Sequence, residues 1–171
     1  MRTVSYIILG IMFLVYLTPA NNFNTSNEAI NYLLRSFYHA NIQHIVANAI
    51  SFYSLSFIED VMGSTSFIIM MVFLWIVSSM LLYIYHLIFP SRKVYTVGFS
   101  GIVFGMMVVY LSLMGQSPLI GITGLVISIL PQLFVPGISH EGHICGIIAG
   151  AIYILLFPTK KYMNNMPNAK N

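Results

Sequence analysis

Six apolar stretches, separated by short polar segments, dominate this sequence. A helix that crosses a bilayer needs about 20 mostly apolar residues, and about 17 is the lower limit. We therefore predict an all-α, polytopic membrane protein in which residues 1–158 form a bundle of six transmembrane helices. The stretches that approach this length are Val4–Ala20, Phe37–Ile58, Phe67–Phe89, Phe99–Met114, Pro118–Pro136 and Gly142–Phe157.

The composition supports lipid as the main surrounding of this chain of 171 residues. Charged residues make up 6% and hydrophobic residues 58%, whereas an ordinary soluble domain is about 25% charged. A domain of this size could not hide so much apolar surface from water. The sequence thus excludes a soluble enzyme, a disordered chain and a nucleic-acid-binding protein. The single cysteine, Cys145, excludes an intramolecular disulfide and a multi-cysteine zinc site.

The positive charges indicate the topology. An even number of crossings places both termini on one side of the membrane, with four Lys/Arg residues against three on the opposite side. Because Lys and Arg are enriched on the cytoplasmic side, this balance favours cytoplasmic termini, with a disordered cytosolic tail over residues 159–171. The two sets are Arg2, Lys160, Lys161 and Lys170, and Arg35, Arg92 and Lys93.

The loop after the first stretch is predicted to be partly helical. Thr25 and Glu28 have the spacing of a capping box, and the apolar residues that follow share one helical face. This pattern favours a short helix in the outer membrane interface, although a plain extension of the second stretch fits it too. Glu28, Glu59 and Asp60 are interpreted as solvated or interfacial charges of the loops.

Strongly polar side chains inside a membrane helix usually face the bundle interior and mark a working site. In the second stretch Asn41, His44, Asn48 and Ser51 are three, four and three residues apart, so they form one stripe. Such side chains also hold helices together by hydrogen bonds. We prefer that structural reading for Asn41 and Ser51, and a functional one for His44 with Asn48.

The fourth and sixth stretches each begin with a polar residue beside glycines. Ser100 lies between Gly98 and Gly101, where its backbone N–H has no partner within the helix and can serve an oxyanion. Gly101 and Gly105 form a G-x-x-x-G face that allows close approach of another helix. In the sixth stretch His143, which follows a loop containing His140 and Glu141, shares a face with two further glycines, Gly146 and Gly150.

If these two glycine faces meet, Ser100 and His143 come together. A lone histidine is more often structural, but one paired with a serine is a candidate general base. The second, fourth and sixth stretches would all begin at the same membrane face, so His44, Asn48, Ser100 and His143 would lie within ~15 Å of it.

These patterns together resemble the rhomboid intramembrane serine proteases in their six-span form. The resemblance covers nearly the whole chain, with three motifs in the family's order: H-x-x-x-x-H-x-x-x-N, G-x-S-G and H-x-x-G-x-x-x-G. It implies a Ser100 nucleophile with His143 as its base, and an oxyanion hole from the Ser100 N–H, His44 and Asn48. It also implies transmembrane protein substrates, no metal or other cofactor, and a membrane-embedded first loop. Residues with a structural or pocket-lining role would be His39, Gly98, Gly101, Phe104, Gly146 and Gly150.

The chain departs from the family pattern in places that bear on stability and substrate gating. Phe104 stands where rhomboids often carry an aromatic hydroxyl, and Val61 replaces the arginine of a Glu-x-Arg motif. The first-loop Trp-Arg motif is incomplete. An inactive rhomboid-like protein that binds transmembrane helices is therefore an alternative to a protease.

Two other readings compete, and one location is predicted. A zinc site from His39, His44, His140 and His143 is possible in principle, but His140-Glu-Gly-His143 is one residue short of H-E-x-x-H. A small transporter or channel is also conceivable, but this sequence has no inverted repeat or charged pathway to support it. The compact six-span form suggests a multi-pass protein of a bacterial plasma membrane, its site opening to the extracytoplasmic side, and no oligomeric state is predicted.

Overall fold

The computed structural model describes residues 2–19, 25–90, 97–130 and 139–166. Within these ranges the regular structure is helical, without a strand, as the sequence predicts. Each predicted apolar stretch overlaps a helix. The elements are α1 (Thr3–Tyr16), α2 (Glu28–Arg35), α3 (Ile42–Leu55), α4 (Ile58–Met62), α5 (Ser64–Ile88), α6 (Ser100–Leu113), α7 (Pro118–Ile129), α8 (His140–Leu156) and the 3-10 helix η4 (Thr159–Asn165).

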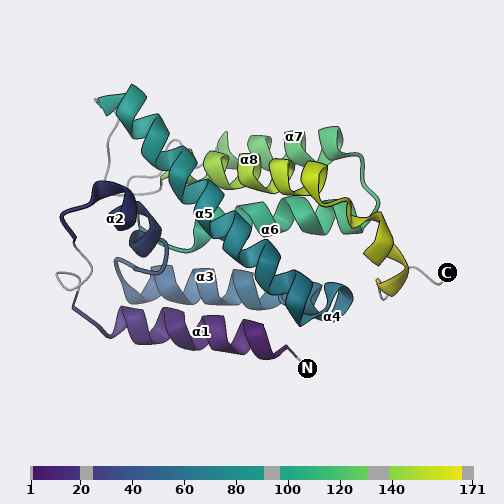
Figure 1. Cartoon of the computed structure of the whole chain (residues 1–171), viewed down its shortest axis with the longest axis horizontal. Helices are drawn as coiled ribbons and strands as arrows, with labels where there is room; N and C mark the ends of the chain where they lie inside the picture. The colour runs from purple at the N-terminus through teal and green to yellow at the C-terminus, as the bar shows by residue number, and fades with distance from the viewer. Residues whose placement is uncertain (1, 20–24, 91–96, 131–138, 167–171) are drawn as a thin grey trace.

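The helices form one bundle, and three of them begin at the same end of it (Figure 1). α1 lies beside α3, α5 crosses the bundle diagonally, and α6 makes its most extensive contact with α8. α3, α6 and α8 all begin at one end, whereas α1 begins and η4 lies at the opposite end (Figure 1). This arrangement brings the polar starts of the second, fourth and sixth stretches to a common level.

Only some of these helices are long and apolar enough to cross a bilayer by themselves. Among the described residues, Ile42–Met62 and Ser64–Ile88 meet that test, and α8 with η4 would add a third span bent by 91°. Thr3–Tyr16, Ser100–Leu113 and Pro118–Ile129 are shorter apolar helices. The chain has the helices of a membrane protein, while the count of six spans stays a prediction.

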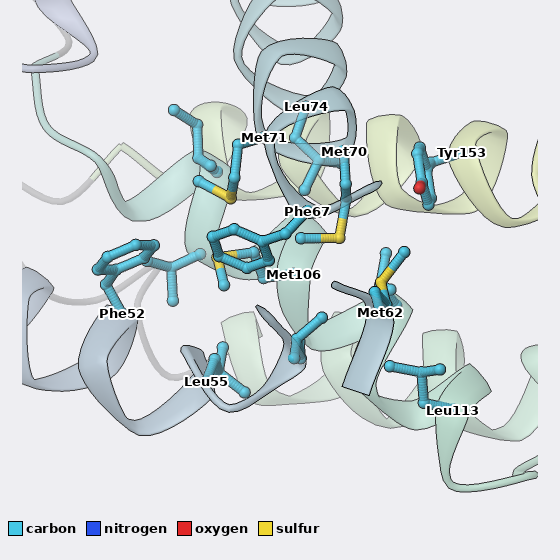
Figure 2. Close-up of a cluster of buried hydrophobic side chains, with 14 of the residues drawn as sticks. Phe52, Leu55, Met62, Phe67, Met70, Met71, Leu74, Met106, Leu113 and Tyr153 are labelled. Carbon is cyan, nitrogen blue, oxygen red and sulfur yellow. The ribbon is translucent and has the colours of Figure 1, made fainter. Parts of the chain in front are cut away.

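Methionine side chains fill much of the core where the helices cross (Figure 2). Met70 and Met106 are fully buried, and Met62 and Met71 are buried beside them. Phe67 of α5 lies among these thioethers (Figure 2). Because methionine is unbranched and flexible, it fills the irregular gaps between helices that cross at different angles.

The first helix is held by a buried carboxylate, contrary to the interpretation of Glu59 as a solvated charge. Glu59 is only 2% exposed. Its carboxylate accepts hydrogen bonds from the backbone N–H groups of Val4 (3.0 Å) and Ser5 (2.9 Å) and from the hydroxyls of Ser5 (2.6 Å) and Ser64 (2.7 Å). A helix start leaves its first N–H groups without intrahelical partners, so a carboxylate there is favourable.

The predicted helix of the first loop exists, but its cap differs from the expectation. Asn27, and not Thr25, caps α2, because its side chain accepts a hydrogen bond from the Ile30 N–H. The helix is docked on α5: the Trp75 indole N–H donates to the Leu33 carbonyl at 2.9 Å. A separate helix at this position rules out a plain extension of the second stretch.

The segment after α8 forms the 3-10 helix η4 and packs on the bundle, whereas the sequence predicts a disordered tail from residue 159. The hydroxyls of Thr159 and Ser112 lie 2.7 Å apart, and the Tyr162 hydroxyl donates to Ser66 Oγ at 2.9 Å. Met166 is buried in the core. Periodicity along the tail could not reveal these partners, because they lie on other helices. Residues 167–171 lie outside the described ranges.

Candidate active site

The close contact between α6 and α8 depends on glycines in both helices. A Cβ atom at Gly105 would lie 3.0 Å from the Gly146 carbonyl oxygen, and one at Gly150 would lie 2.6 Å from the Gly105 oxygen. A Cβ at Gly146 would overlap with the Gly101 carbonyl oxygen. The two glycine faces therefore meet, which is the condition for bringing Ser100 and His143 together, and we call this contact the glycine seam.

At one end of the glycine seam a serine and a histidine meet. His143 Nε2 lies 2.9 Å from Ser100 Oγ, within hydrogen-bond range. Ser100 is the first residue of α6, so its backbone N–H has no partner inside that helix. His143 is in the first turn of α8 and is 9% exposed. The histidine is thus buried and the serine half-buried, on two helices that glycine brings together.

A phenylalanine fixes the plane of the histidine ring. The rings of Phe104 and His143 are stacked, with centroids 4.4 Å apart and planes 24° apart. Phe104 lies one turn after Ser100 on α6, so the same helix supplies both the hydroxyl and the ring. The stacking needs only the aromatic ring, which explains why a side chain without a hydroxyl can serve at this position.

Gly98 brings the loop before α6 against His44. A Cβ at Gly98 would lie 2.6 Å from His44 Cε1 and 3.6 Å from Asn48 Nδ2, and its φ of +113° also favours glycine. The side chains of His44 and Asn48 therefore lie next to Gly98, which precedes Ser100 by two positions. Asn48 Nδ2 donates to the His44 carbonyl at 3.0 Å. Asn41 has the structural role that we preferred for it: its side chain caps α3 by accepting from the His44 N–H.

His39 connects the start of α3 to the start of α6. The Phe99 N–H donates to His39 Nε2 at 3.5 Å, so the ring carries its proton on Nδ1, which donates to the Phe37 carbonyl at 3.1 Å. The His39 and His44 rings pack edge to face, with centroids 5.1 Å apart. This buried, neutral arrangement supports a structural role.

The zinc reading finds no support in the geometry. Among the described residues, no three His, Cys, Asp or Glu side chains are grouped so that they could hold a metal ion. His140 and Glu141, expected in a loop, form the first turn of α8 and pair with each other at 3.3 Å. Ser139 caps that helix by accepting from the Gly142 N–H.

The sequence did not indicate which residues line a pocket of about 40 Å³ beside Ser100, where polar and apolar side chains both contribute. Its walls include Arg35 from α2, Ser78 and Ser79 from α5, and Gly98. The helices that build it are far apart in the sequence, so no single motif reveals it. The adjacent serines in the third apolar stretch are the one local signal that pointed there.

Comparison with known proteins gives the family. The Rhomboid domain family matches residues 26–160. A protein of Acanthamoeba polyphaga mimivirus, named as a putative rhomboid protein, is 59% identical over 161 residues, which are 94% of each chain. The mitochondrial Rhomboid-like protein 14 of Arabidopsis thaliana is 35% identical over 141 residues, 72% of this chain and 42% of the relative.

A third relative, an uncharacterized protein of Mycobacterium leprae, is 29% identical over 137 residues, 72% of this chain and 55% of its own. The predicted bacterial plasma membrane gains no support from a set that includes a viral and a plant protein. The domain match and the mimivirus relative each span most of the chain, and they agree with the motifs. The chain belongs to the rhomboid family of membrane proteins.

Proposed function

We propose that this protein is an intramembrane serine endopeptidase that hydrolyses peptide bonds in or near the transmembrane helices of membrane-protein substrates. The observation that carries the proposal is the 2.9 Å contact between Ser100 Oγ and His143 Nε2 inside an apolar bundle. Nucleophilic catalysis typically uses a nucleophile and a base within hydrogen-bond reach of each other, and a third group orients the base. Here Phe104 is the orienting group.

In the first half of the reaction, His143 Nε2 removes the proton from Ser100 Oγ as the oxygen attacks the scissile carbonyl carbon. The tetrahedral intermediate carries a negative charge on the former carbonyl oxygen. Its collapse breaks the C–N bond, and the imidazolium gives its proton to the leaving amine. Ser100 then carries the acyl group as an ester.

In the second half, a water molecule loses a proton to His143 and attacks the ester, and the proton returns to Ser100 Oγ as the acid product leaves. The Ser100 N–H and the side chains of His44 and Asn48 are the donors that would stabilise both oxyanions. They come from the elements that meet at Gly98. Removal of one such donor costs about 10²–10³ in rate in soluble serine proteases.

The position of the pair suits a reaction that needs water. Ser100 and His143 each lie in the first turn of a helix, and these helices begin at the same end of the bundle (Figure 1). The site is therefore near one face of the membrane, opposite to η4. With cytoplasmic termini, which the charge balance favours, the site opens to the extracytoplasmic side.

The decisive experiment is covalent labelling of the full chain in detergent with a fluorophosphonate. Attack by Ser100 Oγ forms an O–P bond and expels fluoride. Mass spectrometry then identifies the peptide that carries the label. We expect labelling of the wild type, and none of Ser100→Ala or His143→Ala. The matched control is Ser54→Ala, because Ser54 is an exposed hydroxyl on α3.

The alternative function, an inactive rhomboid-like protein that binds transmembrane helices, predicts a different result. It requires no activated serine, so a folded wild type would stay unlabelled and a transmembrane substrate would be bound without cleavage. Equal labelling of the wild type and Ser100→Ala would likewise refute the proposed protease.

A further inference from the structure

The 3-10 helix η4 lies at the end of the bundle opposite to Ser100 and has no part in the proposed reaction (Figure 1). The match to the family domain ends at residue 160, so most of η4 follows the part of the chain that resembles other rhomboids. The chain turns by 91° between α8 and η4. A segment perpendicular to a helix that runs through the bilayer lies along the membrane surface, at the level of the lipid headgroups.

One face of η4 is fixed to the rest of the bundle. Its anchoring side chains are Thr159, Tyr162 and Asn165, which are three positions apart and therefore share a face of a 3-10 helix. Their partners are the Ser112 hydroxyl of α6 (2.7 Å), the Ser66 hydroxyl of α5 (2.9 Å) and the Val61 carbonyl of α4 (3.0 Å). The orientation of η4 is thus set by three helices and does not depend on a ligand.

The positions between these anchors carry two adjacent lysines, Lys160 and Lys161, and both are exposed. Lys161 Nζ lies 4.7 Å from the centre of the Tyr162 ring, so its ammonium group is held beside an anchored side chain. No ion pair among the described residues uses either lysine. Both charges are therefore available to an external anion.

The end of α8 that leads into η4 carries an apolar surface. Leu155 and Leu156 are 79% and 62% exposed. The Phe157 ring stacks on Tyr153, with centroids 5.0 Å apart, and meets Phe73 edge to face at 5.9 Å. Aromatic side chains are typical of the level at which acyl chains meet headgroups. We call residues 155–161 the elbow, in which an apolar half is followed by a cationic half.

We propose that the elbow binds one anionic phospholipid, whose phosphate pairs with Lys160 and Lys161 and whose acyl chains pack on the apolar half. A soluble anion would use the lysines alone, and a zwitterionic lipid would bring its own cation to a segment without Asp or Glu. An anionic lipid matches both halves. With cytoplasmic termini the elbow faces the cytoplasmic leaflet, whose surface carries negative charge. This inference does not rest on the proposed activity.

The test is native mass spectrometry of the full chain in detergent. Phosphatidylglycerol or phosphatidylcholine with the same acyl chains is added, and the readout is the apparent dissociation constant of the first bound lipid. We expect phosphatidylglycerol to bind about 25-fold more tightly, because each basic side chain near an anionic headgroup contributes about fivefold.

Variants then locate the recognising groups. Lys160→Gln and Lys161→Gln should each weaken phosphatidylglycerol binding by about fivefold, and the double variant by about 25-fold, with phosphatidylcholine binding unchanged. Replacing both lysines by arginine keeps the charges and should keep the preference. Arg2→Gln is the matched control: it removes a cation at the same end of the bundle, but one that is paired with Asp60, so it should keep the wild-type preference.

Three outcomes overturn this inference: equal binding of the two lipids by the wild type, a full preference in the double glutamine variant, or an equal loss of preference in Arg2→Gln. Inorganic phosphate should displace phosphatidylglycerol no better than sodium chloride of the same ionic strength, and displacement by phosphate alone would show a site for a soluble anion instead. Should the double variant not fold, the single variants decide. None of these measurements uses the reactivity of Ser100, so the proposed protease stands or falls separately.

Discussion

The glycine seam gives the sharpest test of how the structure positions the site. Replacing Gly146 by alanine places a methyl group on the carbonyl oxygen of Gly101, and 3.0 Å from its Cα. Both obstacles are backbone atoms in the first turn of α6, so no flexible side chain can move aside. The substitution must therefore push the two helices apart.

The size of the effect follows from the geometry. To restore van der Waals contact the helices must separate by about 1 Å. Ser100 and His143 lie at the end of the seam that includes Gly101 and Gly146. Their distance of 2.9 Å should therefore lengthen to about 4 Å, beyond hydrogen-bond range. A misplacement of about 1 Å can cost about 10²-fold in rate. Overpacking costs about 1–3 kcal/mol, against about 1 kcal/mol gained in helix propensity.

The assay compares the fluorophosphonate labelling rate with thermal unfolding in the same detergent. We expect Gly146→Ala to remain folded and to label about 10²-fold more slowly. Gly10→Ala is the matched control, because a Cβ at this position in α1 meets nothing within 4 Å; it should label at the wild-type rate. A Gly146→Ala protein that labels as fast as the control would refute the claim that the seam positions the pair.

Three further predictions concern the groups around the site and the first helix. Glu59→Gln should lower the free energy of unfolding by about 2 kcal/mol, because the buried carboxylate loses its charge-assisted bonds. Asp60→Asn, at the exposed pair with Arg2, should lower it by less than about 1 kcal/mol. Equal losses of the two variants in thermal unfolding would contradict this prediction. Phe104→Leu should slow labelling about 2- to 10-fold through loss of the stacked ring, and Phe13→Leu, at a side chain that is 55% exposed, should not; an unchanged rate in Phe104→Leu would count against the orienting role. Asn48→Ala should reduce cleavage of a transmembrane substrate by about 10²–10³-fold and leave a measurable remnant; wild-type cleavage would remove it from the oxyanion site.

The sequence predicts well those features that lie within one helix or in matched pairs of helix faces. The G-x-x-x-G spacing of Gly101 and Gly105 identified a face that allows close approach, and a second glycine face after His143 identified its partner. Their meeting then followed from a single assumption about packing. The polar stripe through His44 and Asn48 was visible for the same reason, since side chains four residues apart share a face.

Features that depend on distant partners were missed. From its neighbours in the sequence, Glu59 is interpreted as a loop charge. Only the fold shows that it binds the start of α1, which precedes it by more than 50 positions. The pocket beside Ser100 combines α2, α5 and the start of α6. Periodicity reports which face of a helix is apolar but not which helix covers it, so these contacts were beyond its reach.

The methionines of the core and the glycine seam give this small bundle two mechanical regimes. Along the glycine seam the backbones of α6 and α8 are in direct contact, so the relative position of the reacting atoms is rigid. The thioethers of Met62, Met70, Met71 and Met106 can change rotamer at little cost, so the layer around them is compliant. Changes in the packing of helices outside the seam would therefore be taken up by methionine rotamers before they altered the distance between hydroxyl and imidazole.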